Sequence, residues 1–285
     1  NTHGPGENFM STGFVIDGAP SIGSWTAYAL GSENSNLPAF VAIAVPRGVP
    51  LAGPNIWASG FLPAVFQGTP FNMQTTIPHL DRPNAFTGEA DVASRALLQR
   101  LNERHLLRNP GDTQLAARIA SYELAAKLQL SAPEVSDLSQ ESAAIHHFYG
   151  TDSHNKLKAG FARNCILARR LLERGVRFVQ LYSGGGHLAD TWDAHVSVEN
   201  NHGQHAGEVD KPIAALISGD ERSWPVRARP RSGATRSSRA LSIYVCRDEP
   251  GGTVHIDRKT LELGGDAVLG AIVLESWSSQ WRTRV

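Results

Sequence analysis

The chain has 285 residues, of which 41% are hydrophobic and 19% charged, and its 27 basic residues balance its 27 acidic ones. This apolar share is enough for a globular core, and zero net charge gives no field to draw the protein to nucleic acid or an anionic membrane. No apolar run reaches the roughly 18 residues of a membrane-spanning helix. We therefore expect neither nucleic acid nor a membrane as a partner. Cys165 and Cys246, the two cysteines, are too few for a disulfide framework.

The first part of the chain, residues 1–85, is rich in Gly, Pro, Ser and Asn. Within it the apolar run 39–45, closed by Pro38 and Pro46, predicts a strand of a parallel sheet that is buried on both faces. Residues 51–83 are expected to form a long ordered loop whose aromatic side chains serve packing. His3 is a second-rank site candidate, because tight glycine turns often hold site residues.

Three helices are expected next. Ala93, Leu97 and Leu101 recur at four-residue spacing, which predicts a helix from Asp91 to the break at 109–111. Asp112 is placed to cap a second helix, which would form an antiparallel pair or an insertion with the first. The third helix spans about 157–174, with arginines near its negative end and Gly175 as its left-handed cap.

A predicted strand, 176–182, follows directly and stops at a glycine-rich loop, 183–186. Ligands of α/β folds collect beyond the carboxyl ends of such strands. Four of the eleven histidines lie just downstream with several carboxylates: His187, His195, His202 and His205, with Asp190, Asp193, Glu199, Glu208 and Asp210. This stretch is the densest group of metal-ligand residues in the chain, although a solvated polar loop with chance histidines is the plainer alternative.

The residue types in this stretch suit a divalent metal ion. Asp193 and His195 are two positions apart, so in an extended loop both side chains project to one side, and a carboxylate beside an imidazole suits Zn²⁺, Mn²⁺ or a related ion. His202 and His205 are three apart and would share one helix face. The pattern does not distinguish Zn²⁺, Mn²⁺, Mg²⁺ and Ca²⁺.

A serine mechanism is the second interpretation of the same region. Ser183 would be the nucleophile, His187 or His195 its base, and the glycine amides an oxyanion hole. The signal is weak because the loop lacks the leading glycine of a nucleophile elbow. His146 and His147 are interpreted as half-buried helix or loop residues rather than ligands, since no carboxylate stands at ligand spacing.

The last part of the chain changes in composition. Residues 219–240 carry six arginines among Ser and Pro, which predicts a segment that does not order. Residues 241–246 and 267–274 are expected to be strands without recognisable chemistry.

Several blocks of the sequence together resemble one bacterial family, the sulfatase-like domain of unknown function numbered 1501. They cover roughly residues 1–217: GPGENFMSTG (4–13), PSIGSWTAYALGSEN (20–34), LPAF (37–40), SGFLPAVFQG (59–68), RIASYELA (118–125), LARRLLERGVRFVQLY (167–182), WDAH (192–195) and VDKPI (209–213). This family is grouped with alkaline phosphatases and sulfatases. The resemblance implies an α/β fold, mainly a parallel sheet flanked by helices, with divalent metals at the strand ends and an exported or periplasmic location.

The resemblance also carries residues over. Asp193, His195 and Asp210 match the Asp, the His and the Val-Asp of the relatives' metal site, although here one residue separates Asp193 from His195, whereas three usually separate them in the relatives. The family's first strand, with its nucleophile, would precede Asn1, and the chain opens with neither a Met nor a signal peptide. After Ile217 the family's next blocks do not follow, which a frame change near Ser218 would explain. We therefore expect an incomplete alkaline phosphatase-like domain at 1–218 and a divergent tail at 219–285.

These observations together predict a metal-dependent hydrolase of small-molecule phosphate, sulfate or similar esters. Asp193, His195, His202, His205 and Asp210 are the expected ligands or their supports, with His187 and His195 as catalytic candidates. One rival is a carboxyl-ester or lactone hydrolase that uses metal-bound water or Ser183. The other rival is a non-catalytic, truncated remnant.

Overall fold

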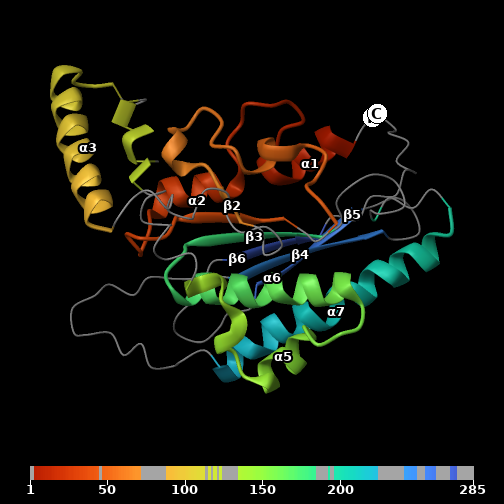
Figure 1. Ribbon diagram of the computed structural model, residues 1–285. Helices are drawn as coiled ribbons and strands as arrows, with labels where there is room; N and C mark the ends of the chain where they lie inside the picture. The colour runs from red at the N-terminus through yellow and green to blue at the C-terminus, as the bar shows by residue number, and fades with distance from the viewer. Residues whose placement is uncertain are drawn as a thin grey trace.

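The computed structural model describes residues 3–44, 47–71, 88–112, 115–116, 118–120, 122–123, 134–183, 192, 196–223, 241–248, 254–260 and 270–274. The side chains of His3 and of residues 218 onward fall outside this description. The chain folds as a mixed α/β protein with a mainly parallel sheet between two helical layers (Figure 1).

The sheet has the strand order β2-β1-β3-β6-β4-β5. Its centre is parallel: β1 (Phe40–Ile43) pairs with both β2 (Thr69–Phe71) and β3 (Phe178–Ser183). β6 (Gly270–Leu274) and β4 (Leu241–Asp248) continue the parallel sheet, and β5 (Val254–Thr260) closes it antiparallel to β4. The strands expected near 39–45, 176–182, 241–246 and 267–274 are confirmed, whereas β5 was not expected.

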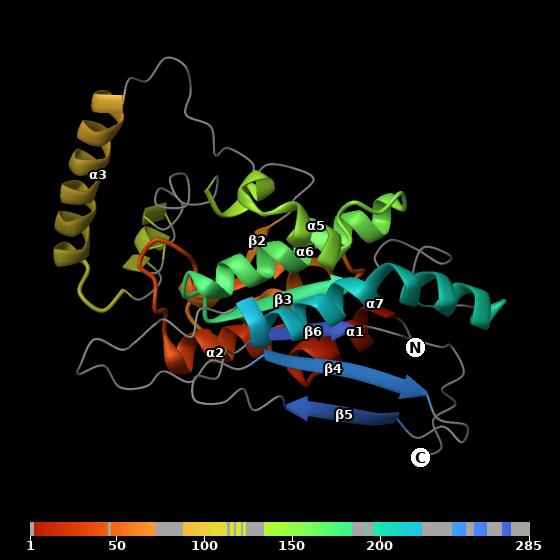
Figure 2. The same cartoon turned by 90° about the horizontal axis from the view of Figure 1, so that it is seen from below.

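The two faces of the sheet are covered by different parts of the chain. α1 (His3–Thr12) and α2 (Ile22–Leu30) lie on one face, and α5 (Ala143–Tyr149), α6 (Lys156–Glu173) and α7 (Val198–Ser223) lie on the other (Figures 1 and 2). Every residue of β1 and β3 is buried, as expected for strands covered on both sides.

α2 approaches the sheet closely because it carries Gly23 where it crosses β1. A Cβ atom on Gly23 would stand 2.4 Å from the ring of Phe40. Phe40 also meets Phe178 of β3 edge to face, with ring centroids 5.3 Å apart. Because successive strand residues alternate between faces, Gln180 and Tyr182 point to the α2 side and Ser183 to the side of α6 and α7.

α6 confirms the helix expected at about 157–174. Asn155 caps it by accepting from the backbone N–H groups of Leu157 and Lys158, and Gly175 follows its end with a φ of 89°. The expected inner face is buried, including Phe161 and Cys165, whose thiol pKa is raised by burial.

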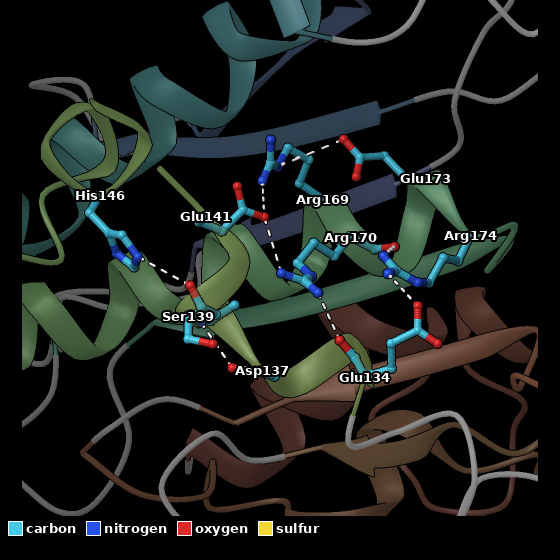
Figure 3. Close-up of polar contacts among 10 residues, drawn as sticks. Glu134, Asp137, Ser139, Glu141, His146, Arg169, Arg170, Glu173 and Arg174 are labelled. Carbon is cyan, nitrogen blue, oxygen red and sulfur yellow. Dashed lines mark hydrogen bonds and ion pairs between the residues drawn. The ribbon is translucent and has the colours of Figure 1, made fainter. Parts of the chain in front are cut away.

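The C-terminal half of α6 is tied to the segment before α5 by buried charge (Figure 3). Arg169 and Arg170 both bond Oε1 of Glu141, at 2.6 and 3.2 Å, and both arginines are about 6–7% exposed. Arg170 also donates to the backbone carbonyl of Glu134 at 2.7 Å. One carboxylate therefore holds two guanidinium groups, which ties this segment to the helix.

Two expectations for the first part of the chain are wrong. Residues 51–71 are not one long loop, because they hold two 3₁₀ turns, Gly53–Trp57 and Ala64–Phe66, and then β2. His3 is not in a glycine turn, since it is the first residue of α1. Pro5 is tolerated in the first turn of this helix because a backbone N–H at that position has no hydrogen-bond partner within the helix, so its absence in proline costs nothing. Residues 72–83 of the expected loop lie outside the described residues.

α3 (Gly88–Arg108) is the helix expected from Asp91, but it has no buried residue. Leu97 and Leu101, whose four-residue spacing predicted the helix, are 58% and 50% exposed. Val92 and Leu98 lie outside the stripe formed by Ala93, Leu97 and Leu101, so the apolar residues of the helix are not confined to one face. Asp112 caps the following turn by accepting from the backbone N–H of Leu115, as expected.

α7 runs through residue 218 and ends at Ser223, so the disorder expected from residue 219 is wrong for 219–223. Residues 224–240 lie outside the described residues. Within the part of the chain that the structure describes, no helix combines the length and apolar character of a membrane span.

Candidate functional site

The candidate site lies where β1 and β3 end. The two strands are parallel and pair through Ile43 and Leu181, so their carboxyl ends meet at one edge of the sheet. Ser183 is the last residue of β3, and Arg47 follows β1 after a short connection. α7 packs beside α6, and its Glu208 bonds to Arg47, so α7 brings side chains to the strand ends. Parallel α/β folds place their ligands in this position.

Trp192 joins the strand end to α7. Its indole Nε1 donates a hydrogen bond to the Oγ of Ser183 at 3.1 Å. Its ring lies 5.8 Å from the ring of His202 and 5.2 Å from that of His205, centroid to centroid. One indole thus contacts the two imidazoles that α7 presents on this side.

The orientation of His202 is set by the backbone of Trp192. Nε2 of His202 lies 2.9 Å from the carbonyl oxygen of Trp192, and a carbonyl only accepts, so Nε2 carries the proton. In the neutral imidazole Nδ1 then holds the lone pair. A metal-binding histidine is commonly held in this way, with one ring nitrogen donating to a carbonyl and the other available to the ion.

Behind these rings stands a buried ion pair. Arg47 donates two hydrogen bonds to Glu208, Nε to Oε2 at 3.2 Å and Nη2 to Oε1 at 2.6 Å, and their side chains are 9% and 7% exposed. His205, itself 2% exposed, places Nδ1 3.8 Å from Oε2 of the same carboxylate. The guanidinium therefore neutralises Glu208, which in turn lies beside the imidazole of His205.

The structure brings only part of the expected ligand set together. His202 and His205 share one side of α7 and meet Ser183 through Trp192, as the three-residue spacing suggested. Asp210 is exposed. It lies five positions after His205, about 140° around the helix, so it points away from this group. His187, Asp193 and His195 lie outside the described residues.

Two residues of the site were not singled out by the sequence patterns. Arg47 is a single basic residue soon after the apolar run 39–45, and this position is the sequence feature that could have indicated a role in the site. In the sequence analysis Trp192 was noted only as part of the WDAH block, which also contains Asp193 and His195. Glu208 was noted as one carboxylate among several, without its partner.

The described neighbour of the Ser183 hydroxyl is the indole of Trp192, whereas His187 and His195, the bases expected for a serine mechanism, lie outside the described residues. Ser183 is 6% exposed, and its Oγ accepts the indole proton of Trp192. An activated serine needs a base within hydrogen-bond reach, and no histidine of the described residues bonds to Ser183. In the structure the Ser183 hydroxyl holds the indole of Trp192 in place through this hydrogen bond.

A metal ion would need ligands beyond those described. Among the described residues no group of three His, Cys, Asp or Glu side chains is arranged to hold an ion. His202 has the fitting tautomer, whereas Glu208 is already occupied by Arg47. The described chain therefore supplies one well-oriented imidazole and its buried surroundings.

The histidine pair of α5 has local partners elsewhere. Nδ1 of His146 lies 2.7 Å from Oγ1 of Thr151, and its Nε2 donates to the carbonyl of Leu138. His147 lies 2.8 Å from Oδ2 of Asp152 and lowers the pKa of that carboxyl through the hydrogen bond. The helical placement of both histidines and the half-burial of His146 are as expected, but half-burial is wrong for His147, whose side chain is 78% exposed.

Comparison with known proteins gives one match. A family model described as "Protein of unknown function (DUF1501)" matches residues 1–222, a range that includes every described residue of the candidate site. No curated protein and no solved structure matches the chain.

Proposed function

The chain belongs to the DUF1501 family, and we propose that this member is a metal-dependent hydrolase of ester bonds, with phosphate and sulfate esters as the first candidates. The observation that carries the proposal is the group of Trp192, His202, His205 and Glu208 at the carboxyl edge of β1 and β3, in which Trp192 and His202 are half-buried and His205 and Glu208 are buried. A polar group of this kind is costly to bury, and at this edge of an α/β sheet it is typical of a site.

The proposed ligands are His202, through Nδ1, with Asp193 and His195 from the neighbouring sequence. Asp193 directly follows Trp192, whose carbonyl orients His202. When bound, a divalent ion supplies Lewis-acid polarisation of the ester oxygens and a lowered pKa for a water molecule. Asp210 is not part of the proposed set, because it is exposed on another side of α7.

The remaining residues are proposed to position this set. His205 packs under Trp192, and Glu208 keeps Arg47 and His205 at fixed places behind the indole. Ser183 holds the indole nitrogen. His187, in the glycine-rich segment after β3, is proposed to carry a proton to or from the leaving group.

The test compares the wild type, an Asp193→Ala, His195→Ala double variant, and Asp210→Ala as a matched carboxylate control. Elemental analysis of the purified proteins gives bound metal, and aryl phosphate, aryl sulfate and aryl carboxylate esters report turnover with and without a chelator. We expect the double variant to lose both metal and turnover and the control to keep both. Equal metal content in all three proteins, or turnover indifferent to the chelator, contradicts the proposal.

A further inference from the structure

The face of the molecule opposite α7 carries a surface without charge. It is built from α2 with its flanks, residues 18–32, and from the segment 48–71, and neither stretch contains Asp, Glu, Lys, Arg or His. Asp, Glu, Lys and Arg make up 19% of the whole chain, so two uncharged stretches on one exposed layer are a marked depletion. We call this the uncharged surface. Depletion of charge together with enrichment in aromatic residues distinguishes the centre of a protein–protein interface from the remaining surface.

Four aromatic rings run across the uncharged surface in continuous contact. Phe61 meets Trp25 at 5.7 Å between ring centroids, Trp25 meets Tyr28 at 6.1 Å, and Tyr28 meets Phe66 at 5.2 Å, each pair nearly perpendicular. Phe61 is 71% exposed, Tyr28 53% and Trp25 43%. The rings hold one another in place while leaving much of their area in water, so little side-chain freedom remains to be lost on binding.

One end of this row projects and the other end is hollow. Phe61 is the most exposed of the four rings. Phe66, at the other end, lines a hollow of about 280 Å³ together with Val65, Leu37 and Ala27. Of the described residues that line it, Glu123 alone is charged. An aromatic knob and a largely apolar hollow, which Ser32, Asn34 and Ser35 also line, are thus joined by Trp25 and Tyr28.

We propose that the uncharged surface binds a second copy of this chain, with Phe61 of each copy entering the hollow beside Phe66 of the other. Each chain carries both knob and hollow, so a two-fold axis between them fills both hollows and closes the assembly as a dimer. The absence of charge suits self-association, because a surface of one sign would repel its own copy across a two-fold axis.

The dimer contact would leave the candidate active site open. α2 lies on one face of the sheet and α7 on the other (Figures 1 and 2), so the two surfaces are on different sides of the molecule. A variant that separates the copies is therefore expected to keep metal binding and turnover, which makes this inference independent of the proposed activity.

The test is sedimentation of the full chain over a dilution series. Phe61→Asp places a charge on the knob, whose ring is 71% exposed and therefore contributes little to the core. Val65→Asp places a charge at the hollow. Leu107→Asp, at an 82% exposed apolar residue of α3, is the matched control. We expect a dimer for the wild type and the control. Each of the other two variants should raise the dissociation constant at least about thirtyfold, as for residues central to an interface.

A monomeric wild type overturns the proposal, and so does a Phe61→Asp variant that stays as tightly dimeric as the control. Flotation with phosphatidylcholine vesicles tests lipid as the alternative occupant of the uncharged surface. A monomeric wild type that floats with the vesicles, while Phe61→Asp does not, would assign the surface to lipid. Circular dichroism of each variant verifies that the fold is retained.

Discussion

The indole Nε1 of Trp192 donates a hydrogen bond to the Oγ of Ser183 across 3.1 Å, and this hydrogen bond connects the end of β3 to the residue that contacts the α7 histidines. Ser183 is the last strand residue, and Trp192 supplies both the ring that contacts His202 and His205 and the carbonyl that orients His202. The geometry of the candidate site therefore depends on where this indole lies.

Trp192→Phe should show how much that bond contributes. The variant keeps an aromatic ring against the imidazoles but leaves the Ser183 hydroxyl, 6% exposed, without its donor. We expect a loss of about 1–2 kcal/mol in the free energy of unfolding, measured by urea denaturation. Trp25→Phe, at a 43% exposed ring, is the control and should change stability by less. An unchanged midpoint for Trp192→Phe would mean that the bond does not hold the segment.

Glu208→Gln should be among the most damaging single changes in the site. It removes the charge that neutralises Arg47, whose side chain is only 9% exposed, and an uncompensated buried charge costs about 3–5 kcal/mol. The measurement is the free energy of unfolding at neutral pH.

Asp152→Asn is the matched control for that charge change. Its partner His147 is 78% exposed, so water screens the pair and its loss should cost far less than the loss of the buried pair. A Glu208→Gln loss no larger than that of the control would show that water reaches the Arg47 pair.

The Arg47–Glu208 pair also shows what the sequence does not reveal. The two residues are 161 positions apart, and nothing local to either one indicates the other. By contrast β1, β3 and α6 follow from short-range signals: an apolar run between Pro38 and Pro46, a strand-like run that stops at a glycine-rich loop, and a helical spacing of apolar residues that ends at Gly175. Such signals act over a few residues, so they predict elements but not the contacts between them.

Two features of the structure could not be predicted from local patterns. β2 is only three residues long and contains Pro70, which is tolerated because β2 lies at the edge of the sheet. Its strand character comes from pairing with β1 and not from its own sequence. Asp210 was expected as a ligand through the resemblance, but the phase of α7 turns it away from His205, and that phase is known only once the helix is placed on the sheet.

Glu173 should make stability fall with rising pH. Burial raises the pKa of this carboxyl above its usual 4.5, although the coulombic attraction of Arg169 acts in the other direction. Below pH 4.5 both folded and unfolded states hold the proton; above it the unfolded state releases the proton first, so stability falls until pH exceeds the folded pKa. The gain in the free energy of unfolding that Glu173→Gln shows over the wild type should therefore be larger at pH 7 than at pH 4.

Asp152 supplies a control of opposite sign. Its pKa is lowered by the His147 hydrogen bond, so its contribution is present above the usual pKa of 3.8 and is lost as pH falls through the folded value. Denaturation of Glu173→Gln and Asp152→Asn at several pH values should thus give differences from wild type that change in opposite directions. A Glu173→Gln difference that does not vary with pH would contradict the assigned burial effect.

His202→Gln should separate metal binding from folding. The amide nitrogen of glutamine reaches the place of Nε2 and can still donate to the carbonyl of Trp192, so stability should change little. The change removes the Nδ1 lone pair, the proposed ligand atom, and should weaken divalent-metal affinity by more than the 10–100-fold typical of residues that only orient a ligand. Competition with a chromophoric chelator gives that affinity directly. His205→Gln, the neighbouring imidazole beside Glu208, is the comparison, and as a positioning residue it should stay within that range. Equal effects of the two variants, or unchanged affinity in His202→Gln, would remove His202 from the ligand set and leave it as a support for Trp192.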